Sequence, residues 1–132
     1  MVEENPVQAP VVYTGQRNVA LGRPVAIDSA DASSADPSVL TDGKCENVYT
    51  GCANGAENAW AVVELDEITP LSSINVVTYS NKTSSAYYYY YEVLVSEDNE
   101  EWVKVGEHTG SNPGYKGTTF TFDTINAKYV KV

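Results

Sequence analysis

The sequence predicts an all-β domain, a sandwich or jelly roll of short strands joined by long loops. Ten tyrosines accompany many Val and Thr residues and a single Met, and aromatic and β-branched side chains favour strands. Apolar residues follow no sustained helical period, and several short segments alternate apolar with polar side chains instead. Stretches rich in Gly, Asn, Asp and Ser separate these segments, as the loops of β-sandwiches do.

The expected strands are short and are spread along most of the chain. We expect them at residues 18–25, 60–65, 74–79, 87–96, 102–105, 118–122 and 127–132. A turn at Thr69 and Pro70 should separate the second strand from the third, and the charged segment 97–101 should close a hairpin. Residues 28–36, 43–58 and 106–117 are expected to be loops.

Length and charge limit the classes of protein to consider. At 132 residues the chain can form one domain with its own core. Residues 1–17 are expected to be a linker or leading arm, and residues 18–132 the domain. No signal peptide or membrane span is evident. If the parent protein is secreted, we expect this stretch to be one module of it. A net charge of −10 disfavours nucleic acid and anionic membrane lipid as partners.

The inventory of reactive side chains argues against an enzyme. His108 is the only histidine, and no nucleophile motif lies near it, so a catalytic triad is not expected. Acidic pairs such as Asp28 and Asp31 could hydrolyse glycosides only if their two carboxyl groups faced each other across a cleft, and their sequence context favours solvated turns.

The two cysteines, Cys45 and Cys52, lie close together in the sequence. Two cysteines and one histidine cannot complete a structural zinc site with four ligands. A local disulfide or two free thiols remain as alternatives. A disulfide across so short a loop would stabilise the fold by roughly 2–3 kcal/mol, and it would imply an oxidising compartment.

Five consecutive tyrosines, 87–91, form the most unusual segment. On a strand, successive side chains point to opposite faces. Tyr87, Tyr89 and Tyr91 are therefore expected on one face, and Tyr88 and Tyr90 on the other. One face should belong to the core.

Five segments together resemble the discoidin domain, or coagulation-factor type C domain, whose bacterial members include the family 32 carbohydrate-binding modules. They occur in the family's order and are NVALGRPV (18–25), VLTDG (39–43), WAVVEL (60–65), YEVLVSEDNEEW (91–102) and AKYVKV (127–132). The resemblance implies a jelly-roll β-sandwich in which Trp60 and Trp102 belong to the core. It also implies a closing strand that would follow Val132, so we expect a sandwich with an open edge.

The resemblance further implies a structural calcium ion beside the segment 39–43. Asp42 would supply a carboxylate, Val39 and Lys44 backbone carbonyls, and Asn47 a side-chain oxygen. Calcium takes six to eight oxygen ligands, and few acidic ligands give weak binding. The alternative is an ordinary turn in which Asp42 bonds its own backbone.

In the family, the ligand binds to loops at one end of the sandwich. The residues implied here are Tyr87 and Tyr88 as ring platforms, Asn81 and Lys82 as hydroxyl partners, and His108, Asn112 and Tyr115 from a later loop. The alternative is that tyrosines pack across the sheet, which we expect for Tyr89 and Tyr91. The Arg common in galactose-binding members is missing after the strand 74–77, so simple galactose specificity is not expected.

The resemblance therefore implies a non-catalytic carbohydrate-binding module of a larger secreted bacterial protein. Such a module would tether a glycoside hydrolase or an adhesin to glycans, with its other domains as further partners. The alternative is a discoidin module that binds a protein or a cell surface and has no sugar site.

Overall fold

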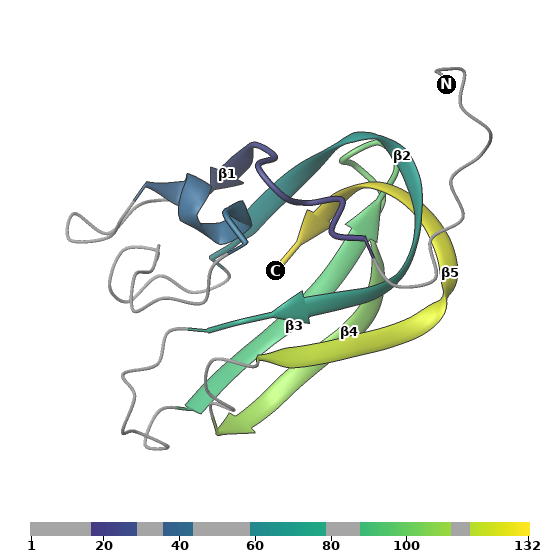
Figure 1. Cartoon of the computed structure of the whole chain (residues 1–132). Helices are drawn as coiled ribbons and strands as arrows, with labels where there is room; N and C mark the ends of the chain where they lie inside the picture. The colour runs from purple at the N-terminus through teal and green to yellow at the C-terminus, as the bar shows by residue number, and fades with distance from the viewer. Residues whose placement is uncertain (1–16, 29–35, 44–58, 79–87, 112–116) are drawn as a thin grey trace.

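The computed structural model describes residues 17–28, 36–43, 59–78, 88–111 and 117–132. These residues form an antiparallel sheet in the strand order β1-β2-β5-β3-β4, together with one short 3-10 helix, η2 (Figure 1). Their bounds are β1 Val25–Ile27, η2 Pro37–Thr41, β2 Ala61–Val76, β3 Tyr88–Ser96, β4 Val103–Ser111 and β5 Thr118–Lys131. The predicted all-β fold is confirmed.

Strands β2 and β5 are long enough to take part in both layers of the fold. They pair along most of their length, from Val62 opposite Lys131 to Val76 opposite Thr118. The register shifts between Glu64 and Thr69, and both strands curve (Figure 1). In contrast, β5 pairs with β3 through Leu94–Ser96 alone among the described residues. The remainder of β2 and β5 therefore forms a ribbon that lies across the β3–β4 hairpin.

The core lies between this ribbon and the rest of the sheet. Leu65, Leu71, Val95 and Ala127 form its buried centre, and a fully buried Leu or Val side chain stabilises a fold by about 1.5–3 kcal/mol. Gly106 of β4 makes room for the ring of Phe120, because a Cβ there would meet Phe120 Cγ at 2.9 Å. A glycine is therefore what lets the two layers approach at this point.

Neither tryptophan belongs to the core, so that prediction is wrong. Trp60 is 36% exposed, and Trp102 is half-buried beneath the side chain of Lys131. Trp60 immediately precedes β2 and lines the same groove as Val62, whereas Val63 and Leu65 on the opposite face pack inward. The alternation of β2, continued by one turn of the pleat, thus places Trp60 on the outer face of the sheet. Trp102, just before β4, lies on that face beside Lys131.

Two pairs of predicted strands are in fact single strands. Residues 60–65 and 74–79 were expected on either side of a turn, but β2 runs through Thr69 and Pro70. Pro70 is tolerated there because β1 covers β2 at Ala61–Val63 only, which leaves one edge of β2 without a strand partner among the described residues. Likewise, β5 joins residues 118–122 to residues 127–132.

The hairpin prediction is confirmed, but its second strand runs further than expected. Strands β3 and β4 pair around the charged turn 97–101, where the Asp98 carboxylate accepts hydrogen bonds from the backbone amides of Glu100 and Glu101. Strand β4 continues to Ser111, although residues 106–111 were expected in a loop. Their pairing with β3 supplies the backbone hydrogen bonds that a loop would lack.

The strand predicted at residues 18–25 is confined to its end. Residues 19–22 form a turn, in which the side chain of Asn18 accepts a hydrogen bond from the Ala20 amide and Gly22 has a φ of 74°. The turn is tied to η2, because the Gly22 amide donates to the Thr41 carbonyl and the Thr41 hydroxyl donates to the Arg23 carbonyl. Local hydrogen bonds of Asn and the left-handed Gly outweigh the strand pattern here.

Within the part of the chain that the structure describes, no helix has the length and apolar character that a membrane crossing requires.

Candidate functional site

Four strand ends meet at one end of the fold. Strand β3 begins at Tyr88 opposite Ser111, where β4 ends, and β2 ends at Val76 opposite Thr118, where β5 begins. In Figure 1 these ends lie together at the lower left of the sheet. We refer to Tyr88–Tyr91 with His108–Ser111 as the tyrosine end.

Tyr90 and Tyr91 point to opposite faces of β3, as expected. Tyr90 lies opposite Thr109 and is 71% exposed, the highest value among the exposed large hydrophobic residues of the described chain. Tyr91 lies on the other face and packs inward against the ring of Phe120, with centroids 6.1 Å apart. Burial raises the pKa of the Tyr91 hydroxyl, and a hydrogen bond with the Thr118 side chain opposes that rise. The predicted packing role of Tyr91 is confirmed.

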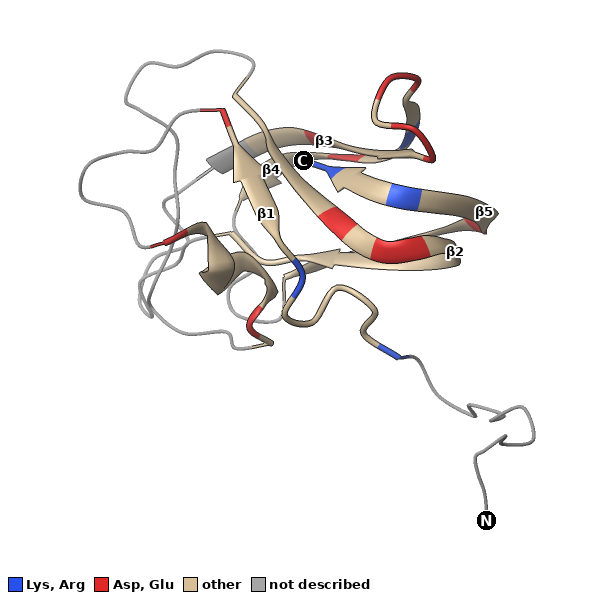
Figure 2. Cartoon of the chain, turned by 90° about the horizontal axis from the view of Figure 1, so that it is seen from above, with Lys and Arg blue, Asp and Glu red and all other residues tan. Residues whose placement is uncertain are grey.

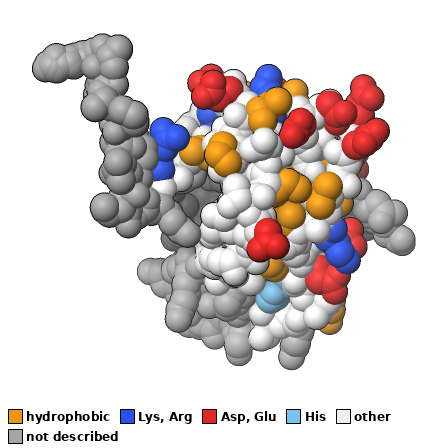
Figure 3. Space-filling view, turned by 90° about the vertical axis from the view of Figure 1, so that its right-hand side faces the viewer, with side chains coloured by type: hydrophobic (Ala, Val, Ile, Leu, Met, Phe, Trp, Pro, Cys, Tyr) orange, Lys and Arg blue, Asp and Glu red, His pale blue; other side chains and the backbone are white. Residues whose placement is uncertain are grey.

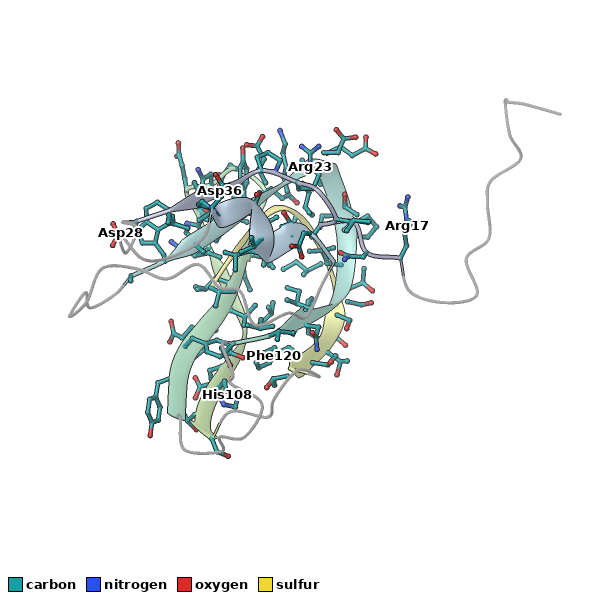
Figure 4. All side chains as sticks on the ribbon, turned by 60° about the vertical axis from the view of Figure 1, so that its left-hand side comes forward. Arg17, Arg23, Asp28, Asp36, His108 and Phe120 are labelled. Atoms are coloured by element: carbon teal, nitrogen blue, oxygen red, sulfur yellow. The ribbon has the colours of Figure 1, made fainter. Side chains whose placement is uncertain are left out.

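His108 lies on β4, directly opposite Tyr91 of β3, rather than in a loop. Its ring stacks on Tyr91, with centroids 5.3 Å apart and planes at 19°. Figure 4 shows His108 and Phe120 on the same side of the β3–β4 hairpin. The Nε2 atom is buried, and no described group bonds it. A buried polar atom without a partner is uncommon in a folded protein and calls for an explanation.

Most of the other predicted ligand residues lie outside the described residues. These are Tyr87, Asn81, Lys82, Asn112 and Tyr115. For Tyr88 the backbone is described, and it pairs with Ser111. Their roles stay predictions.

Tyr90 was not among the predicted ligand residues, although it has the most exposed tyrosine ring of those described. The signal was present in the sequence, because alternation from an inward Tyr91 makes Tyr90 point outward. The resemblance implies ligand residues in the loop before β3 and at the start of β3, and it does not include Tyr90.

The predicted calcium ligands are described only in part. Asp42 ends η2 and is exposed, and Val39 lies within the same helix, where its amide donates to the Asp36 carbonyl. Lys44 and Asn47 lie outside the described residues, as do Cys45 and Cys52. The described ligands supply at most one carboxylate and one carbonyl, whereas calcium needs six to eight oxygens. Calcium binding therefore stays a prediction.

Charged side chains lie over much of the sheet, and one group adjoins the tyrosine end, where Glu92 and Glu107 pair next to Tyr91 and His108. Acidic residues occupy the β3–β4 turn and the middle of β2, and acidic side chains also gather at the upper edge of the face shown in Figure 3 (Figures 2 and 3). Several are paired: Lys104 contacts Glu107 at 2.7 Å and Glu92 at 3.6 Å, and Lys128 contacts Glu64 at 3.5 Å. Exposed pairs of this kind contribute about 0–1 kcal/mol each.

The family of NedA-like, galactose-binding domains of the F5/F8 type C class matches residues 39–132. Among curated protein sequences, none matches the chain.

Several solved structures share the fold. A chitosan-binding module in complex with chitotriose, from a chitosanase/glucanase of Paenibacillus sp. IK-5, is 23% identical with a TM-score of 0.70, over 86% of this chain and 83% of that one. A fucose-binding module of Streptococcus pneumoniae is 17% identical with a TM-score of 0.66, over 92% and 86%. A Clostridium perfringens module in complex with GalNAc-β-1,3-galactose is 20% identical with a TM-score of 0.64, over 83% and 81%.

Proposed function

Because the chain belongs to the NedA-like, galactose-binding domain family of the F5/F8 type C class, we propose that it is a non-catalytic carbohydrate-binding module. It tethers a larger secreted bacterial protein, a glycoside hydrolase or an adhesin, to glycans outside the cell. The tyrosine end is the proposed binding surface.

The exposed ring of Tyr90 is the observation that carries this proposal. A pyranose has an apolar C–H face that stacks on a flat aromatic ring, and its hydroxyls need nearby donors and acceptors. Tyr90 is 71% exposed and lies opposite Thr109. Its ring costs little entropy to hold in place, because it is anchored in a paired strand.

The neighbouring tyrosine and histidine form a rigid support for this surface. Tyr91 is held between His108 and Phe120, so the backbone that carries Tyr90 is fixed from the inner side. The buried Nε2 of His108, which no described group bonds, lies at the same end of the hairpin. We propose that it forms a hydrogen bond that helps to hold the binding surface in place.

The ligands of the structural relatives support the class of partner. Chitotriose and GalNAc-β-1,3-galactose are both oligosaccharides, and each occupies a relative with this fold. At 17–23% identity, these relatives do not select one sugar for this chain. A surface with one or two stacked rings binds weakly, with a Kd of roughly 0.1–1 mM, or about −4 to −5.5 kcal/mol. Attachment to a larger protein offsets that weakness through avidity.

A glycan array that compares the wild type with Tyr90→Ala tests this proposal. We expect the wild type to bind at least one oligosaccharide and Tyr90→Ala to lose that binding, while Tyr90→Phe, which keeps the ring, retains most of it. Ile68→Ala is the matched control, because Ile68 is 50% exposed at the bend of β2. An array without signal from a folded wild type would refute the proposal and favour the alternative of a module that binds protein.

A further inference from the structure

Strands β1, β2 and β5 run side by side (Figure 2). A groove of about 460 Å³ lies on their outer face, between them and the end of the β3–β4 turn. This volume falls within the range of about 300–1,000 Å³ that is typical of small-ligand sites. The side chains that matter for recognition are two tryptophans, one tyrosine and two charged groups: Trp60, Trp102, Tyr129, Glu64 and Lys131.

The register of the sheet explains why these residues share one face. Lys131 lies opposite Val62, and Tyr129 lies opposite Glu64. Val63 and Val130 occupy the alternate positions and pack against the core. The alternation that fills the core therefore also places Val62, Glu64, Tyr129 and Lys131 in the groove. Trp60 and Trp102 complete it from the residues just before β2 and β4.

Trp60 and Trp102 have different surroundings within the groove. The ammonium of Lys131 lies 4.2 Å from the centre of the Trp102 ring, so that ring is already engaged by a cation, an arrangement that contributes about 0.5–1 kcal/mol at exposed sites. No ring or cation contact with Trp60 is found in the described part of the chain, and Trp60 is 36% exposed. The contact with Lys131 thus occupies one face of the Trp102 ring, whereas a face of the Trp60 ring is available to a ligand.

The charges in the groove favour a ligand that offers oxygen atoms to a cation. The Glu64 carboxylate already has a partner, since it lies 3.5 Å from the Lys128 ammonium. Lys131, by contrast, has no carboxylate within 4.0 Å among the described residues. Its ammonium can therefore donate to a hydroxyl or a carboxylate that enters the groove.

We propose that this groove is a second saccharide site, separate from the tyrosine end. It takes a pyranose that stacks on Trp60 while Lys131 donates to one of its hydroxyl or carboxylate oxygens. The inference rests on the proposed carbohydrate binding and extends it to a second surface. Trp102, just before β4, and His108, within β4, are separated along the chain by roughly 20 Å, at about 3.3 Å per residue, so the two surfaces are distinct.

Intrinsic fluorescence tests this proposal directly, because both tryptophans of the chain line the groove. The protein is titrated with a galacturonic acid oligomer and with a neutral galactose oligomer. We expect a saturable change in tryptophan emission with one or both. A larger response to the galacturonic acid oligomer identifies a carboxylate as the group that Lys131 binds, and an equal response identifies a hydroxyl.

Matched lysine variants separate a specific contact from a general effect of charge. Lys131→Ala and Lys104→Ala each remove one positive charge, but Lys104 does not line the groove. We expect Lys131→Ala to weaken binding about tenfold and Lys104→Ala to leave it within about twofold. Trp60→Ala should weaken saccharide binding by about tenfold or more, as measured by isothermal titration calorimetry. Equal weakening in both lysine variants would overturn the proposal.

The two proposals fail in different ways. Binding on the glycan array that leaves tryptophan emission unchanged would overturn the second site and keep the first. A fluorescence titration that disappears in Tyr90→Ala would show one site instead of two and overturn this inference. If neither method detects a saccharide, both proposals are wrong.

Discussion

Replacing Gly106 with alanine should destabilise the domain, even though the same change usually helps a strand. At a strand position with open space, Gly→Ala stabilises by about 0.4–1 kcal/mol, because alanine restricts the unfolded chain. At Gly106 the added Cβ would meet three atoms of the Phe120 ring, with Cγ at 2.9 Å and Cε1 at 3.1 Å. Overpacking of this kind costs about 1–3 kcal/mol. The sign of the effect therefore reports on the packing of the two layers.

The ring cannot move aside freely, because Phe120 also packs edge-on against Tyr91. We expect Gly106→Ala to lower the melting temperature by about 3–15 °C, at roughly 3–5 °C per kcal/mol for a domain of this size. Thermal and urea unfolding, followed by circular dichroism, measure the change.

A double-mutant cycle ties this loss to the ring. Adding Phe120→Leu shortens the side chain that the new methyl group meets, so the double variant should lose less stability than the sum of the two single changes. Thr109→Ala, an exposed change on the same strand, should stay within about 0.5 kcal/mol. If Gly106→Ala is as stable as the wild type, the packing of Phe120 against β4 is wrong.

Three further predictions concern acid, calcium and the cysteines. Hydrogen bonds from the backbone amides of Glu101 and Glu100 and from the Ser96 hydroxyl hold the pKa of Asp98 below its usual value. Such a carboxylate stabilises the fold above its usual pKa of about 3.9, and that contribution is lost as the pH falls through the lower folded-state pKa. Asp98→Asn should therefore flatten the acid side of the stability curve, and a slope equal to that of the exposed control Asp123→Asn would contradict this. Calcium at ten times a millimolar Kd should add about 1.4 kcal/mol of stability. Asp42→Asn should remove that gain, and an unchanged melting temperature at 10 mM calcium would exclude the site. If Cys45 and Cys52 are bridged, a reducing agent should remove roughly 2–3 kcal/mol, and alkylation of both thiols in the untreated protein would rule the bridge out.

Local pattern predicted the strands wherever one face is buried and the partner is near in sequence. The hairpin of β3 and β4 is such a case, because alternating apolar residues flank the charged turn 97–101. Pattern failed where a distant partner decides the outcome. The polar residues between Phe122 and Ala127 read as a break, yet pairing with β2 carries β5 through them. Pro70 likewise predicts a turn from local sequence, yet pairing with Asn126 of β5 keeps it within β2.

The candidate site could be predicted only in its broad chemistry. Tyrosine alternation placed Tyr91 inside, and the structure confirms it. The same alternation implied an outward Tyr90, but exposure depends on what covers a face, and no local pattern gives that. The outer-face position of Trp60 and Trp102 was also missed. Large aromatic residues at framework positions suggest a core, whereas the sheet register that decides the matter is set by β5, far along the chain.

The central place of β5 in the sheet has a consequence for how the protein is made. Strands β2 and β3 are joined by β5 and not by each other among the described strands, yet β5 leaves the ribosome after both of them. From the end of β3 at Ser96 to the end of β5 at Lys131, synthesis takes roughly 2–7 s at about 5–20 residues per second. During that interval the β3–β4 hairpin can form locally, while the edge of β2 that β5 later covers has no strand partner. The nascent chain therefore passes through a stage in which an exposed strand edge is open to aggregation.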